Sequence, residues 1–234
     1  MHSKERIRLY DLAMADPSVR VSPHCWKARF ALAHKGLEAD LVPWRFHQRG
    51  SAESGTATVP YLFDGDQLIS DSWRIAVYLE SCFPERPSHF GSPDAVPLAR
   101  MINSWIDLTV MPLLGRVVIP DVFEALDPLD QPYFREARQK RFGITFEDLR
   151  AERESWSLKF LDSLAPLRRQ LSDNPFVSGT APGYADYCVM GAFMFARCTG
   201  NSNLISRADA SVVAWNDRML GLFGGLGRSA PVVI

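Results

Sequence analysis

Residues 58–72 read TVPYLFDGDQLISDS and carry the pattern that decides the fold of the N-terminal half. Two short, mostly apolar runs, 61–63 and 67–69, flank Asp64-Gly65, a dipeptide that readily adopts the positive φ of a hairpin turn. Ser70-Asp71-Ser72 then offers side-chain caps to a helix that ends before Pro84. This stretch therefore predicts two antiparallel strands followed by a helix.

The segment upstream predicts a β-α-β unit. Residues 7–12 alternate apolar and polar side chains, as a strand does. Ser22 caps a helix that has Pro23 at its first position and Gly36 as its stop. Residues 39–46 predict a second strand, which Pro43 places at an edge or a bulge. The order β-α-β, then β-β-α, is thioredoxin-like wiring.

The rest of the chain predicts helices. Residues 84–97 are rich in Pro, Ser and Gly and are interpreted as a linker. Apolar side chains then recur at helical spacing within 98–105, 156–171 and 212–223, which indicates core-facing helices. Residues 133–154 hold many Arg and Glu and are interpreted as a solvated helix face without function. The expected fold is α/β plus all-α, with a thioredoxin-like domain over 1–86 and an all-helical C-terminal bundle over 92–234.

Composition argues against several classes of partner. The 26 basic and 27 acidic side chains give a formal charge of -1, so no general field attracts nucleic acid or anionic lipid. Residues 1–12 lack the apolar core of a secretory signal, and no apolar run is long enough to cross a membrane. The four cysteines form no C-x-x-C pair. We expect a cytoplasmic protein with reduced thiols and without a metal.

Three motifs together resemble those of the cytosolic glutathione transferases, and the resemblance spans nearly the whole chain. Val21-Ser22-Pro23-His24-Cys25-Trp26 lies at the first strand-to-helix loop, where that family keeps its thiol-activating residue. Thr58-Val59-Pro60-Tyr61-Leu62 resembles its segment with a cis proline, and Leu68-Ile69-Ser70-Asp71-Ser72 resembles its acidic-then-Ser motif. In the C-terminal half, Pro182-Gly183-Tyr184-Ala185-Asp186-Tyr187 resembles the family's capping box, with Gly183 where Ser or Thr is usual.

The resemblance implies a glutathione site. The Val59 backbone before a cis Pro60 would pair with the extended tripeptide, as an added strand does. The Asp71 carboxylate would hold the γ-glutamyl ammonium, and the Ser72 hydroxyl with the helix start would hold its carboxylate. Thr58 and Trp26 complete the expected glutathione contacts, and Ser22 would be the catalytic residue that donates its hydroxyl to the sulfur.

The energy that such a Ser22 must supply is modest. Lowering a thiol pKa by about two units needs roughly 2.7 kcal/mol. A hydrogen bond to a charged acceptor supplies about 1.5 to 3 kcal/mol, and a helix N-terminus adds about 0.3 to 1 kcal/mol. Taken singly, Ser22 and Asp71-Ser72 are more often simple helix caps, so the hypothesis rests on their order and spacing together.

The second substrate is expected to be an aromatic electrophile, bound between Ser22 and the helix around Met101, Trp105 and Leu108. Within the family, the sequence looks closest to the bacterial β-aryl-etherase branch and related fungal-type transferases. The motifs behind this likeness are Leu9-Tyr10-Asp11-Leu12, Ser22-Pro23, Ala31-Leu32-Ala33-His34-Lys35-Gly36, Asp71-Ser72-Trp73 and the tail 222–228. Cleavage of aryl ethers is therefore one expected reaction. Family analogy also predicts a homodimer.

Two alternatives stay open at this point. The chain could hold glutathione without catalysis, as a scaffold. It could instead be a thiol transferase through Cys25, because Ser22-Pro23-His24-Cys25 has the layout of a redox motif whose first cysteine has become serine. Cys25 lies one turn into the helix, so burial is the favoured interpretation. His24 is expected at the surface.

Overall fold

The computed structural model describes residues 6–50 and 55–233. Four strands form the sheet of the first domain: β1 (Ile7–Leu12), β2 (Ala39–Trp44), β3 (Tyr61–Asp64) and β4 (Gln67–Ser70). Their order is β2-β1-β3-β4; β1 and β2 are parallel, and the other two pairs are antiparallel. All four predicted strands are confirmed, and β2 lies at the edge that its proline requires.

The hairpin turn differs slightly from the prediction. Asp64 still pairs with Gln67, so the two turn residues are Gly65 and Asp66 instead of Asp64 and Gly65. Gly65 has φ +59°, the left-handed conformation that glycine adopts without steric cost.

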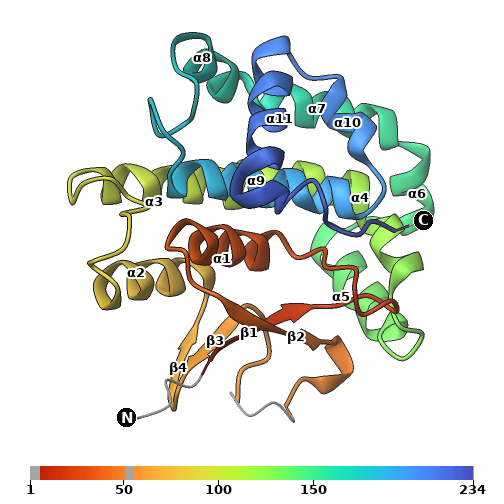
Figure 1. Cartoon of the computed structure of the whole chain (residues 1–234). Coiled ribbons are helices and arrows are strands. Elements are labelled where there is room, and N and C mark those ends of the chain that lie inside the picture. The colour runs from red at the N-terminus through yellow and green to blue at the C-terminus, as the bar shows by residue number, and fades with distance from the viewer. Residues whose placement is uncertain (1–5, 51–54, 234) are drawn as a thin grey trace.

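Two helices of the first domain, α1 (Pro23–His34) and α2 (Ser72–Cys82), separate the sheet from the second domain (Figure 1). Both begin where predicted. A short 3₁₀ turn, η1 (Phe46–Gln48), follows β2.

The remainder of the described chain is helical apart from its connecting loops, which confirms the expected two-part fold. The helices are α3 (Ala95–Trp105), α4 (Met111–Ala125), α5 (Gln131–Phe142), α6 (Phe146–Ala151), α7 (Arg153–Ser163), α8 (Ala165–Asp173), α9 (Tyr184–Cys198), α10 (Ser202–Ser206) and α11 (Ala210–Gly225). A π-helical turn, η2 (Ile106–Val110), joins α3 to α4. The apolar stripe over 156–171 belongs to two helices, because Pro166 starts a new helix after Leu164. No described helix is long and apolar enough to cross a bilayer.

Helix α9 is the centre of the second domain and packs along α1 (Figure 1). All but one of its residues are buried. The two helices approach closely at Gly191, where an added Cβ would lie 2.4 Å from the carbonyl oxygen of Pro23. A glycine at this position therefore lets the start of α1 rest on the second domain.

The predicted capping role of Asp186 is confirmed and extended. Its carboxylate accepts hydrogen bonds from the backbone N–H of Gly183 (3.1 Å), Val177 (2.7 Å) and Ser178 (3.0 Å), and from the indole N–H of Trp215 (2.8 Å). A single fully buried side chain thus fixes the start of α9, the loop before it and α11.

Candidate active site

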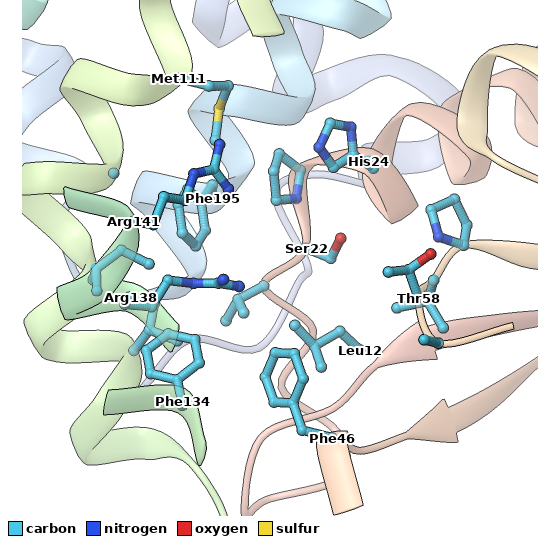
Figure 2. Close-up of a pocket in the computed structure, with 18 of the residues that line it drawn as sticks. Leu12, Ser22, His24, Phe46, Thr58, Met111, Phe134, Arg138, Arg141 and Phe195 are labelled. Carbon is cyan, nitrogen blue, oxygen red and sulfur yellow. The ribbon is translucent and has the colours of Figure 1, made fainter. Parts of the chain in front are cut away.

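A cavity of about 550 Å³ lies between the two domains. One wall comes from the first domain, from the start of α1, the loop before β3 and the start of α2. The opposite wall comes from α4 and α5, with Phe195 of α9 behind them. Ser22, Thr58 and Phe46 lie on the first wall, and Phe134, Arg138, Arg141 and Met111 face them (Figure 2).

Ser22 is the N-cap of α1 and lines the cavity. Its Oγ accepts the backbone N–H of Cys25 at 3.3 Å, which fixes the side chain at the helix start. The acceptor side of the hydroxyl is used in this bond, so its proton remains available for donation into the cavity. The free N–H groups of the first turn add positive potential at the same place. Such a position suits an anion, a thiolate included.

The loop before β3 forms the neighbouring part of the wall. Thr58, Val59 and Pro60 line the cavity, and the Val59–Pro60 bond is cis, as the resemblance implied. Among the described residues, no backbone hydrogen bond to Val59 is found outside the regular elements. The Pro60 carbonyl accepts the N–H of Asp71 at 3.1 Å, which ties this loop to the start of α2.

Asp71 lines the cavity from the start of α2. Its φ is +81°, a conformation that is rare outside glycine and is concentrated at functional sites. The Oδ1 atom accepts the N–H groups of Trp73 (3.0 Å) and Arg74 (3.1 Å), so the residue is a cap as well. The Oδ2 atom accepts no hydrogen bond from the described residues and can serve a ligand.

Two of the residues expected to bind glutathione, Trp26 and Ser72, have buried side chains and are not part of the cavity lining. Trp26 is only 1% exposed and its indole N–H donates to the Arg20 carbonyl, so it is a core residue and does not line the cavity. This prediction is corrected, because the helical position of Trp26 turns it toward the interior. Ser72 is buried beside the cavity, and its carbonyl accepts the Tyr184 hydroxyl at 3.0 Å.

The expected position of the second substrate is also corrected. Met101 and Trp105 line a second, smaller cavity, and Leu108 is 77% exposed. None of the three lines the cavity beside Ser22. Met101 and Trp105 belong to α3, before the π-helical turn, whereas the second-domain residues that line the cavity beside Ser22 begin at Asp107 within that turn. The cavity wall is built instead by Met111, Pro112 and Gly115 of α4 and by α5.

Cys25 is fully buried, as favoured from the sequence. Burial raises the pKa of its thiol well above the ordinary value, and the nearby Asp11 carboxylate acts in the same direction. Asp11 is buried as well, and burial raises its own pKa against the opposing charge of Arg29, 3.5 Å away. A protonated, inaccessible thiol is a poor nucleophile, so this geometry weighs against chemistry through Cys25.

Lys27 and Asp107 form an ion pair next to the cavity, and Asp107 is part of the cavity lining. The Lys27 ammonium of α1 is fully buried, 2.7 Å from the Asp107 carboxylate and 2.9 Å from the Asn103 side-chain oxygen. His24, expected at the surface, lines the cavity with 43% of its side chain exposed, 3.9 Å from Asp107. Partial desolvation in the cavity wall and the charge of Lys27 lower the pKa of His24 against the opposing charge of Asp107, so the ring is neutral at pH 7. No metal-binding cluster of acidic, His or Cys side chains occurs among the described residues.

The wall from α5 was missed from the sequence. The sequence predicts a solvated helix face over 133–154, yet Phe134, Arg138, Arg141 and Phe142 line the cavity. Their spacing of three and four residues places them on one side of the helix. This spacing could have indicated from the sequence that α5 contributes to the site. The many charged residues between these positions favour a solvated face instead.

Comparison with known proteins decides the family. The description "Glutathione S-transferase, N-terminal domain" matches residues 17–87, and "Glutathione S-transferase, C-terminal domain" matches residues 97–223. The chain belongs to the glutathione S-transferase family. Both halves of the cavity thus come from segments that match this family, Ser22 and Asp71 from the first and the α5 wall from the second.

Individual relatives of this glutathione S-transferase are distant. It is 27% identical over 148 residues to a zeta-class glutathione S-transferase of Euphorbia esula, covering 60% of this chain and 63% of the relative. It is 33% identical over 90 residues to glutathione S-transferase Z1 of Arabidopsis thaliana, covering 36% and 38%. The matched segments therefore span less than two thirds of these relatives. The fold is similar to a glutathione S-transferase of Ceriporiopsis subvermispora solved with glutathione, with a TM-score of 0.83 at 22% identity over 98% and 100% of the two chains.

Proposed function

We propose that this protein is a Ser-type glutathione transferase that ionises glutathione at Ser22 and directs its sulfur onto an aromatic electrophile. The observation that carries the proposal is the convergence of Ser22, the Val59 backbone and Asp71 on one cavity wall. Membership of the glutathione S-transferase family supports glutathione as the cosubstrate.

Ser22 has the properties of a thiolate-stabilising donor. Its Oγ is held by the Cys25 N–H, so the hydroxyl proton can point to a ligand without competition from that bond. Preorganised donors of this kind stabilise a developing or existing anion without reorganisation. Sulfur stabilisation needs no general base here, and His24 stays outside the proposed chemistry.

The tripeptide would lie along the first-domain wall. The Val59 backbone offers an unpaired peptide edge, and Thr58 lies beside it. Asp71 Oδ2 would accept the γ-glutamyl ammonium, while the N-terminus of α2, which begins with the backbone N–H of Ser72, would hold the γ-glutamyl carboxylate. These four residues are proposed binding residues.

The electrophile would occupy the space against the opposite wall. Phe46, Met111, Phe134 and Phe142 give it aromatic and apolar surfaces, which suit an aryl group. Aryl ethers, named by the sequence likeness to β-aryl-etherases, are one substrate class in this proposal. Homodimer formation and a cytoplasmic location remain predictions.

The test replaces Ser22 by Ala and measures conjugation of an aryl halide at pH 6.5. Loss of one charge-assisted hydrogen bond predicts a fall in turnover of about 10- to 100-fold, with glutathione affinity nearly unchanged. Ser22→Thr, which keeps the hydroxyl, should retain most of the activity. Ser18→Ala is the matched control, because Ser18 lies in the same loop, is exposed and does not line the cavity.

An unchanged rate in Ser22→Ala would remove Ser22 from the mechanism. If the native protein binds glutathione by calorimetry but converts no aryl halide, epoxide or aryl ether, the protein is a glutathione-binding scaffold instead. Mass spectrometry after treatment with oxidised glutathione tests Cys25, and its burial predicts no mixed disulfide there.

A further inference from the structure

Two arginines of α5 point into the cavity from the wall opposite Ser22 (Figure 2). Arg138 is half-buried and lies near the ring of Phe134, with its guanidinium carbon 4.9 Å from the ring centroid. Arg141 follows three residues later on the same face and is exposed to the cavity. Both side chains lie in the part of the cavity where the electrophile is proposed to bind, on the wall opposite Val59 and Asp71.

Neither arginine has an acidic partner among the described residues. Elsewhere on α5, Arg135 shows the ordinary arrangement, since it pairs with Glu147 at 3.1 Å. Other cations of the second domain are paired in the same way, for example Arg150 with Glu124 and Arg153 with Asp121. Arg138 and Arg141 thus differ from Arg135 in having no ion pair within the described part of the chain.

Neither of the two carboxylates that line the cavity among the described residues forms an ion pair with Arg138 or Arg141. Asp107 forms the ion pair with Lys27, and Asp71 caps α2. Arg49, a third arginine of the cavity, is held in place, because its Nε donates to the Phe46 carbonyl and its guanidinium stacks on Tyr133. Arg138 and Arg141 line the cavity as well, and neither donates a hydrogen bond to another of the residues that the structure describes.

The environment of Arg138 makes an anion favourable there. Burial and the positive charge of Arg141 both lower the pKa of Arg138, although a guanidinium stays charged in proteins. Two like charges three residues apart on a helix repel each other. A carboxylate between them would relieve this repulsion and accept bidentate hydrogen bonds.

We propose that the electrophile of this site carries an anionic group, a carboxylate on an aromatic body, and that Arg138 and Arg141 bind that group while the ring lies against Phe134 and Phe46. The inference rests on the proposed function, because it describes the second substrate of that reaction. It narrows the substrate class from aromatic electrophiles to aromatic acids whose reactive carbon lies on the side facing Ser22.

The test uses two substrates with the same reacting ring, 4-chloro-3,5-dinitrobenzoate and its methyl ester, in which one methyl group replaces the negative charge. In both, the glutathione thiolate forms a C–S bond at the ring carbon, and chloride leaves with the electron pair of the C–Cl bond. The variants are Arg138→Gln with Arg141→Gln, the conservative Arg138→Lys with Arg141→Lys, and Lys140→Gln as the matched control. Lys140 is an exposed cation of the same helix that does not line the cavity.

We expect the double Gln variant to lower kcat/KM for the carboxylate by about 10- to 100-fold and for the ester by less than about threefold. The Lys variant should recover part of the loss, and Lys140→Gln should resemble the native protein. An equal fall for both substrates would overturn the proposal. A weaker affinity for glutathione in the double Gln variant would also overturn it, since the arginines would then hold the tripeptide.

A binding measurement separates this inference from the proposed function. The unreactive analogue 4-methyl-3,5-dinitrobenzoate and its methyl ester are titrated into the glutathione-saturated protein by calorimetry. If no conjugation occurs but the acid still binds more tightly than the ester, and only when both arginines are present, the proposed catalysis fails and the anion site stands. If acid and ester bind equally, the anion site is refuted whatever the catalytic result.

Discussion

The buried ion pair between Lys27 and Asp107 makes the sharpest prediction about stability. Lys27 is fully buried, whereas 28% of the Asp107 side chain reaches solvent. At 2.7 Å, and with an effective dielectric constant of about 20, the two charges attract by about 6 kcal/mol before desolvation is subtracted. Removing one partner of a buried pair typically costs about 3 to 5 kcal/mol, because the other charge is left unpaired.

The unequal burial predicts unequal costs. Asp107→Asn leaves the ammonium of Lys27 buried with only neutral oxygens around it, so we expect a loss of about 3 kcal/mol in the free energy of unfolding. Lys27→Met leaves a carboxylate that can still reach water, and we expect a loss of about 1 to 2 kcal/mol. The double variant should be more stable than Asp107→Asn alone, since no charge is then unpaired.

Urea unfolding of the native protein, both single variants and the double variant measures this double-mutant cycle. For a chain of this length, a loss of 3 kcal/mol also corresponds to a fall in Tm of about 6 to 12 °C. Equal losses in the two single variants would refute the argument from burial. Simple additivity in the double variant would show that the two charges do not stabilise each other.

Two further predictions concern residues that are buried where the two domains meet. Gly191→Ala should lower the free energy of unfolding by about 1 to 3 kcal/mol and displace the start of α1, because the new Cβ would lie 2.4 Å from the Pro23 carbonyl oxygen. Thermal unfolding measures this loss. The control is Gly221→Ala in α11, where the nearest contact of a new Cβ is the Arg228 side chain at 3.9 Å, and it should be nearly neutral. Burial lowers the pKa of His89 to about 4, so below pH 6.5 the unfolded chain binds a proton that the folded chain excludes. The free energy of unfolding should therefore fall as the pH drops from 6.5 toward 4, by at most about 1.4 kcal/mol per pH unit from this residue. His89→Phe should flatten that part of the stability curve, and an unchanged slope would exclude His89 as its source.

The first domain could be predicted closely because its signals are local. Alternating side chains, the Gly65 turn and the caps at Ser22 and Asp71 each act within a few residues, and each gave the observed element. The caps are also the proposed functional residues, so one set of motifs predicted both the fold and half of the site.

The other half of the site depends on contacts between distant segments. The sequence predicted helices around Met101 and Arg138, but their rotation about the helix axis depends on how they pack. The π-helical turn at 106–110 rotates the following helix, which turns Met111 toward Ser22 and leaves Leu108 in solvent. The prediction for Trp26 fails for the same reason. The apolar periodicity of α1 shows which residues share a face of the helix, but not which face borders the cavity.

The tight meeting of α1 and α9 has a consequence for protein engineering. Ser22, the residue proposed to activate glutathione, belongs to the first domain. The helix that it caps, α1, is held in place by α9 of the second domain. A chimera that joins this N-terminal module to the helices of a relative would need a glycine opposite the Pro23 carbonyl and an acid opposite Lys27. Without both, the grafted halves would meet with a steric clash or an unpaired charge directly beneath the cavity.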